Sequence, residues 1–190
     1  MATAIDSDLS VIQVNQAVYN ALSTYVDDAV DIRFDLPDPD SPPIQPTISV
    51  FLYDMYEDLQ LKTAESRQYN EGKLQPSKVN VCCNYLIMYW DKPAKEGSPD
   101  GGAINQATVV MNQVLNALIN NRQLKDLPGA FTRVIPPKEQ LNSLGNFWQS
   151  LGNRPRLMLN FSATVPVSLT DHNEVIPAVE SQQPVMERKG

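Results

Sequence analysis

The sequence has few of the residues that carry chemistry in enzymes and metalloproteins. It holds one histidine, His172, and two cysteines, Cys82 and Cys83, which are adjacent in the chain. Because neighbouring residues of a strand point to opposite faces, these cysteines are poorly placed to share a disulfide or a metal ion. Two adjacent cysteines and one histidine also form no zinc pattern. We therefore expect no metal site, and the cysteine content fits a reducing compartment.

Basic charge and long apolar runs are also scarce. The formal net charge is −7, and no basic face is evident, so we expect no nucleic-acid partner. No segment reaches ~18 uninterrupted apolar residues, which predicts no membrane insertion. The first ten residues, MATAIDSDLS, lack the basic and apolar regions of a signal peptide. We expect synthesis and assembly in the cytoplasm.

Three possible chemical sites can be tested against known patterns. Cys82 or Cys83 as a nucleophile with His172 as its base is a minor alternative, because adjacent strand cysteines usually fill a core or a surface. The acidic segment 35–40 lacks the glycine and the later glutamate of a calcium loop. The glycine-containing segment 97–102 lacks the lysine of a phosphate loop. We therefore predict no catalytic, cofactor-binding or metal-binding residues.

The composition is that of one globular domain. The chain has 190 residues, of which 42% are apolar and 19% charged, enough for one core. The 15 prolines gather in connections, which indicates stiff loops. The last residues, PAVESQQPVMERKG, have little apolar content. We expect a single domain over 1–176 and a flexible tail over 177–190.

Periodicity predicts three helices. The first begins near Leu9 after a capping Ser7 or Asp8 and ends near Tyr25. The second covers about 104–121, and a short third covers 141–151 and ends before Gly152. The first helix has apolar residues at steps of three and four, which we expect to face the core: Leu9, Ile12, Gln16 (imperfectly), Tyr19, Leu22 and Val26.

Alternation predicts the strands, which cover about 30–36, 47–56, 79–90 and 156–169, with a short edge strand over 131–135. A hairpin arm is expected near a turn at 70–72. The strand from Thr47 should turn Phe51, Tyr53 and Met55 to one face. Pro166 predicts that the last strand has become an edge by that point. The fold class is α+β: one mixed, largely antiparallel sheet with about three helices packed on it.

Charge is distributed unevenly along the chain. Residues 1–60 hold 11 of the 22 acidic residues but only one of the 15 basic residues, Arg33. Opposite charges on two regions can steer copies of a chain together. An unevenly solvated surface is the alternative explanation.

The run VDIRFDLPDPDSPPIQPTISVFLYDMYED resembles the start of tail-terminator, or cap, proteins of extracellular contractile injection systems. These systems are phage-tail-like particles of the virulence-cassette and antifeeding-prophage type. Three later features resemble the same family over about 5–170. They are a strand ending in Tyr-x-x-x-Tyr-Trp at Trp90, a Leu-Pro-Gly turn at Gly129, and Trp148-x-x-Leu-Gly-x-x-Pro before the last strand.

The resemblance implies a phage tail-terminator-like domain that forms a ring, in this family a hexamer of identical chains. It implies a structural protein that stops polymerisation of the inner tube and sheath and caps the distal end of a particle that can leave the cell. Sheath and inner-tube proteins are then the partners. A baseplate adaptor of the same particle is the main alternative, and a small cysteine-dependent enzyme is a further one.

Candidate contact residues follow from position. Arg154 and Arg156 stand at the entrance of the last strand, where an acidic neighbour can meet them. Pro166 marks an open strand edge, and an exposed edge can accept or donate a strand. Trp148 is more consistent with a core position than with an interface anchor. The full set of predicted contacts is Arg154, Arg156, Pro166, Val179, Val185 and Met186.

Overall fold

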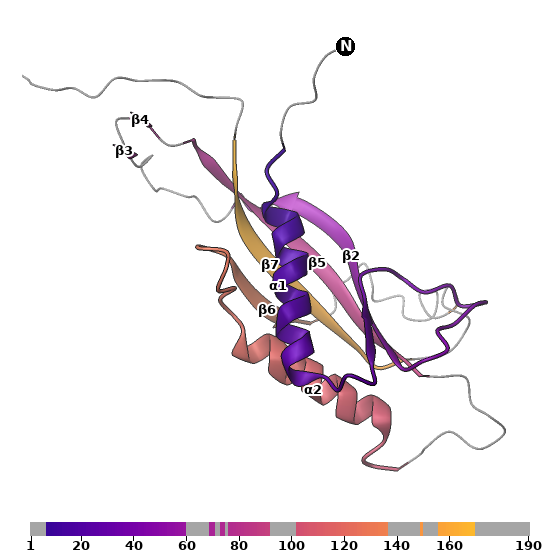
Figure 1. Cartoon of the computed structure of the whole chain (residues 1–190). Helices are drawn as coiled ribbons and strands as arrows, with labels where there is room; N and C mark the ends of the chain where they lie inside the picture. The colour runs from indigo at the N-terminus through magenta and orange to yellow at the C-terminus, as the bar shows by residue number, and fades with distance from the viewer. Residues whose placement is uncertain are drawn as a thin grey trace, which may run out of the picture.

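The computed structural model describes residues 7–59, 69–70, 73–74, 76–91, 102–136, 149 and 156–169. Within them, five strands form one sheet in the order β1-β2-β5-β7-β6, and two helices pack on one of its faces (Figure 1). β1 is parallel to β2, and the other neighbours are antiparallel. This confirms the predicted α+β fold with a mixed, largely antiparallel sheet. The third helix, predicted over 141–151, lies outside the described residues apart from Gln149.

The helices and strands follow one another in the predicted order. The helices are α1 (Ser10–Tyr25) and α2 (Gln106–Asn120). A two-stranded hairpin lies at the predicted turn, formed by β3 (Tyr69–Asn70) and β4 (Lys73–Leu74). The strands of the main sheet are β1 (Asp31–Arg33), β2 (Thr47–Glu57), β5 (Lys78–Trp90), β6 (Phe131–Ile135) and β7 (Met158–Ser168).

β5 lies at the centre of the sheet and is buried on both faces, as its continuous apolar second half predicts. Tyr85 and Ile87 point to the helices, whereas Leu86, Met88 and Trp90 form a second cluster on the opposite face. The Tyr85 ring packs against Phe161 of β7. Its hydroxyl donates a 2.8 Å hydrogen bond to Oδ1 of Asn15 on α1, so one side chain joins both layers.

The buried stripe of α1 differs from the predicted one. Val14, Val18 and Leu22 face the core, while Leu9, Ile12, Gln16 and Tyr19 are exposed. α1 is apolar on two sides, and the side that carries Val14, Val18 and Leu22 packs on the sheet. The prediction was therefore wrong for four of its six positions and right for Leu22 and Val26. On α2, Met111, Val114 and Leu118 are buried.

Two strands depart from their predicted geometry. β2 carries an irregularity between Leu52 and Asp54, after which Met55 lies opposite Cys83. Directly opposed residues share a face, so Met55 lies on the helix side with Cys83. The prediction that Met55 shares a face with Tyr53 was therefore wrong. β1 is shorter than the predicted 30–36, because the chain turns away after Arg33; the Ser49 hydroxyl then donates to the Asp35 carbonyl.

The last strand meets its predicted edge at Pro166. β6 pairs with β7 only over Asn160–Thr164, so among the described residues β5 alone pairs with β7 at Pro166. Gly129, with φ of 83°, approaches the proline there, and a Cβ at this position would lie 3.3 Å from Pro166 Cγ. Both the left-handed backbone and the close approach favour glycine at that turn.

Asp8 joins the start of α1 to the end of β7. Its Oδ1 accepts from the Ser10 N–H at 2.7 Å, and its Oδ2 accepts from the Ser168 N–H at 3.0 Å. The predicted capping role is thus confirmed in part, because Leu9 occupies the cap position itself. Burial raises the pKa of the Asp8 carboxyl, but the bonds from Ser10 and Ser168, with the charge of Lys78, outweigh it and hold the pKa below its ordinary value.

Asp8→Ala should therefore destabilise the fold by about 1–2 kcal/mol at pH 7, as loss of a capping carboxylate does. A lowered folded-state pKa gives stability that is present above the ordinary pKa of 3.8 and is lost as pH falls through the folded value. The difference between the variant and the wild type should therefore shrink as the pH falls below about 4. Urea unfolding at several pH values measures this, with exposed Asp28→Ala as the control; an equal loss in both variants would contradict the assignment.

Candidate assembly surfaces

The thiols are built into the fold and face opposite sides of the sheet, as predicted. Cys83 is fully buried in the core beneath the helices, and burial raises the pKa of its thiol to about 11. Such a thiol is protonated at neutral pH and is a poor nucleophile. Cys82 is buried on the other face, with its Sγ 3.1 Å from Ser162 Oγ. His172, the base of the alternative catalytic reading, lies outside the described residues.

The described residues form neither a metal-binding cluster nor a helix suited to span a membrane. No group of three or more histidine, cysteine, aspartate or glutamate side chains there could hold a metal ion. Over the same residues, neither helix is long and apolar enough to span a membrane.

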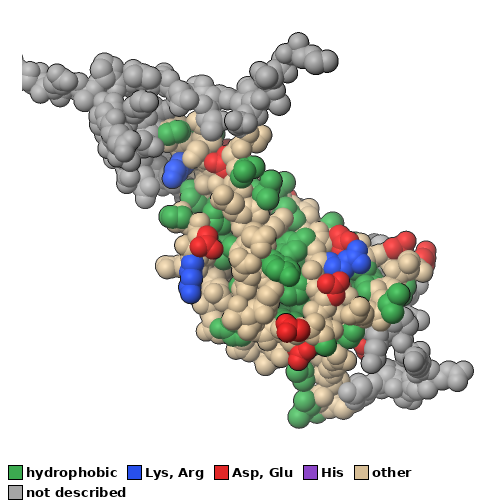
Figure 2. All heavy atoms as spheres, viewed as in Figure 1, with side chains coloured by type: hydrophobic (Ala, Val, Ile, Leu, Met, Phe, Trp, Pro, Cys, Tyr) green, Lys and Arg blue, Asp and Glu red, His purple; other side chains and the backbone are tan. Residues whose placement is uncertain are grey.

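The outward face of the helix layer carries no charge. Neither α1 nor α2 contains an aspartate, glutamate, lysine or arginine. Leu9, Ile12 and Tyr19 of the α1 segment are 56%, 64% and 42% exposed, and Figure 2 shows green apolar side chains on this face of the molecule. Depletion of charge together with exposed apolar side chains is typical of the centre of a protein–protein interface. The sequence signal was the absence of charge from 10–25 and 106–120, which our prediction overlooked.

Several asparagine side chains of α2 and its C-terminal end donate hydrogen bonds to backbone carbonyls four residues earlier. Asn116 donates to the Asn112 carbonyl, and Asn120 donates to the Asn116 carbonyl, each at 2.8 Å. Asn121 repeats the arrangement with the Ala117 carbonyl. These amides already have part of their hydrogen-bonding capacity satisfied within the helix. A partner that covers this face therefore removes fewer unpaired polar groups from water.

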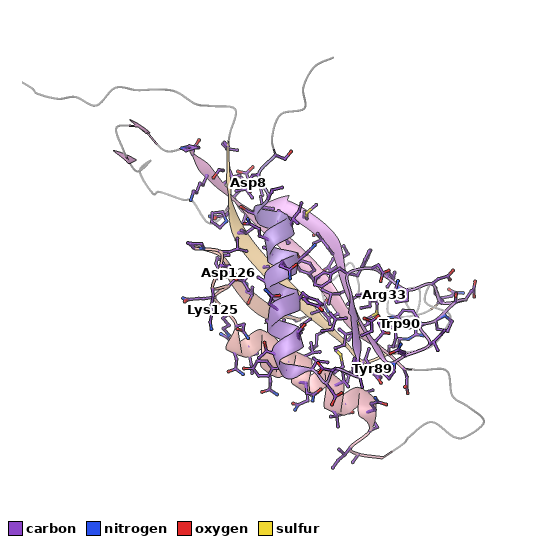
Figure 3. The ribbon with its side chains drawn as sticks, in the orientation of Figure 1. Asp8, Arg33, Tyr89, Trp90, Lys125 and Asp126 are labelled. Atoms are coloured by element: carbon purple, nitrogen blue, oxygen red, sulfur yellow. The ribbon has the colours of Figure 1, made fainter. Side chains whose placement is uncertain are left out.

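A groove of about 200 Å³ lies between α1 and the turn that follows α2. Ala17 and Ala21 of α1 and the almost buried Leu124 give it an apolar floor. Lys125 and Asp126 stand on its outer wall, beside α1 in Figure 3. The turn is held to β6 by a 2.8 Å bond from the Thr132 N–H to the Arg122 carbonyl. The groove is formed by α1 and by a segment about 100 positions later in the chain, so sequence periodicity could not reveal it.

The opposite edge of the sheet is acidic. Arg33, which Figure 3 shows on the other side of α1, pairs with Asp35, and the remaining carboxylates of this region are exposed. Asp38 shapes the connection from β1 to β2, because its Oδ1 accepts from the Asp40 N–H at 2.9 Å. Beyond it, the Ile44 side chain is 87% exposed. The exposed aspartates between α1 and β2 are Asp27, Asp28, Asp31, Asp35, Asp38 and Asp40.

The predicted contact residues fall into two groups. Arg154, Val179, Val185 and Met186 lie outside the described residues. Within them, Pro166 is half-buried, and Arg156 stacks over the ring of Trp90, with its guanidinium carbon 3.7 Å from the ring centroid. This cation–π contact was not foreseen, because it joins the ends of two strands far apart in the chain. Contact of these residues with a partner stays a prediction.

These features define a class: a small α+β domain whose candidate contact surfaces are the uncharged helix face, the groove and the acidic edge of the sheet. The chain belongs to the Pvc16 N-terminal domain family, whose model matches residues 13–181. This confirms the family resemblance predicted from the sequence. No match was found among curated proteins.

Two solved structures are similar over nearly the whole chain. One is the PVC sheath/tube terminator of an extracellular contractile injection system in its extended state, with 51% identity and a TM-score of 0.75 over 98% of this chain. The other is the tube-terminating cap of the anti-feeding prophage, with 56% identity and a TM-score of 0.75 over 97% of this chain. The chain spans 66% and 64% of the lengths of those two proteins.

The two cysteines provide a matched pair of variants. Cys82→Ser replaces the thiol with a hydroxyl that can still hydrogen-bond Ser162, and it should change the free energy of unfolding little. Cys83→Ser places a hydroxyl in an apolar core and should cost about 1–3 kcal/mol. Urea unfolding measures both, and equal effects would contradict the described environments. Both variants should still assemble into particles; loss of assembly by the stable Cys82→Ser variant would instead favour a chemical role for a thiol.

Proposed function

We propose that this protein is a structural cap, or tail terminator, of a contractile injection system. It ends polymerisation of the inner tube and sheath and stabilises the distal end of the particle. The observation that carries the proposal is similarity above 50% identity, over almost the whole chain, to a sheath/tube terminator and to a tube-terminating cap. The proposed role is non-enzymatic, in keeping with the buried and protonated Cys83.

The proposed partners are other copies of the chain, in a ring of six, and the tube and sheath proteins of the particle. Assembly takes place in the cytoplasm before the particle is released. A ring has lateral contacts between copies and axial contacts with the last layer of the filament. The uncharged helix face suits a permanent axial contact, since apolar, charge-poor surfaces are typical of such interfaces. One similar protein is named for both sheath and tube and the other for the tube, so the tube is the partner we propose for the helix face.

Deletion of the gene distinguishes a cap from a baseplate adaptor. Loss of a cap leaves filament growth without a stop, so we expect tails of abnormal length or with unstable sheaths. Electron microscopy of purified particles measures the length distribution, and re-expression of the chain is the control. Complete absence of tails would indicate an adaptor, and tails of normal length and stability would contradict the proposal.

The helix face can be tested with one substitution on α1 and one outside the helices. Ile12→Asp introduces a charge where the side chain is 64% exposed, so the fold should survive while binding to tube ends falls at least tenfold. Leu59→Asp, at a position 73% exposed outside both helices, is the control and should bind nearly as the wild type. Co-sedimentation with purified tubes measures both. Equal binding by both variants would remove the helix face from the contact.

A further inference from the structure

The acidic loop and the groove lie on opposite sides of α1, beside opposite edges of the sheet. We infer that they are the two halves of one contact: the loop Asp35–Pro46 of one copy docks into the groove beside Lys125 of the next copy. This inference rests on the proposed function, in which copies form a ring, and it assigns the lateral surfaces of that ring.

The charges of the two surfaces are complementary. The segment 27–40 carries six exposed aspartates, and its single base, Arg33, is already paired with Asp35. The wall of the groove carries Lys125, with Asp126 as the opposing acid. Arg122 of the same turn and Arg133 of β6 add two exposed bases beside the groove. Complementary charge on two patches steers association and fixes which surfaces meet. Two loops would repel each other, so the charges favour loop against groove.

The shapes are also complementary. Five prolines stiffen the connection from 37 to 46, and the Ser41 N–H donates to the Asp38 carbonyl, so the loop is ordered before binding. Ile44 projects from it almost fully exposed. The groove, about 200 Å³ with Ala17 and Ala21 in its floor, has room for such a side chain, since cavities of ~150 Å³ accept a benzene molecule. Burying Ile44 removes an apolar side chain from water on association.

The position of the two surfaces determines the kind of assembly. A contact between different surfaces of identical chains is head-to-tail, and it leaves one copy with a free groove and the other with a free loop. Repetition closes a ring when the rotation per copy permits. It also makes every lateral contact identical, as a cap built from one chain requires.

Charge reversal tests the pairing. Asp38→Lys/Asp40→Lys in the loop, or Arg122→Glu/Lys125→Glu at the groove, should each weaken self-association at least tenfold, measured by light scattering and native mass spectrometry over a range of concentrations. Glu57→Lys, at an exposed position at the end of β2, is the charge control and should associate like the wild type. Circular dichroism checks that each variant is folded.

Mixing the two folded variants separates this contact from a general loss of association. In an alternating ring, each lysine loop meets a glutamate groove, and each native loop meets a native groove. We therefore expect the mixture to recover oligomers that neither variant forms alone. Failure of the mixture to recover, or wild-type association of either variant alone, would overturn the inference.

The apolar half of the contact has its own matched pair. Ile44→Ser should weaken association, whereas Ile104→Ser should not, although both side chains are over 80% exposed. Equal effects would count against the groove as the site of Ile44. Wild-type chains that form rings and cap tubes while every reversal is without effect would overturn this inference and leave the proposed function standing. Wild-type chains that neither associate nor bind tubes would overturn both.

Discussion

The burial of β5 on both faces is the constraint on which the rest of the structure depends. A strand whose residues Tyr85–Trp90 are all buried must be covered on two sides, and its hydrogen bonds require a neighbour on each edge. β2 and β7 supply the edges, and α1 and α2 cover one face. The Tyr85 hydroxyl then fixes α1 by its bond to Asn15. Because α1 also forms the floor of the groove and the exposed apolar stripe, the interior of the sheet sets the position of both surfaces.

The strands could be predicted from the sequence where burial leaves a continuous apolar run, as in β5, or a strict alternation, as in β7. Which face of α1 is buried could not be predicted from the sequence. Its Val14-Val18-Leu22 stripe and its Leu9-Ile12-Tyr19 stripe both have helical spacing, and only packing against the sheet decides between them. The face of Met55 could not be predicted for another reason. The strand contains one extra residue at Tyr53, and no glycine in the sequence indicates that irregularity.

The candidate surfaces were harder to predict than the fold because most of them are assembled from distant segments. The groove joins α1 to residues 121–126, and Arg156 meets Trp90 across the sheet. The sequence did show how charged residues are distributed along the chain. Acidic residues are concentrated before residue 60, and neither helix contains a charged residue. Both are properties of whole segments, which motif searches do not register. A protein whose role is contact distributes its signal in this way, whereas an enzyme concentrates it in a few residues.

The carboxylate of Asp8 gives the domain a defined path for mechanical load. Residue 169, where the described chain ends, follows a strand that is zipped to β5 along its whole length by bonds perpendicular to the strand. A pull along β7 therefore acts on that ladder in shear, with many bonds resisting together. Part of the same pull reaches the start of α1 through the bond from Ser168 to Asp8. Force applied at Ser168 is therefore borne mainly by the sheet, and Asp8 couples the start of the helix to it.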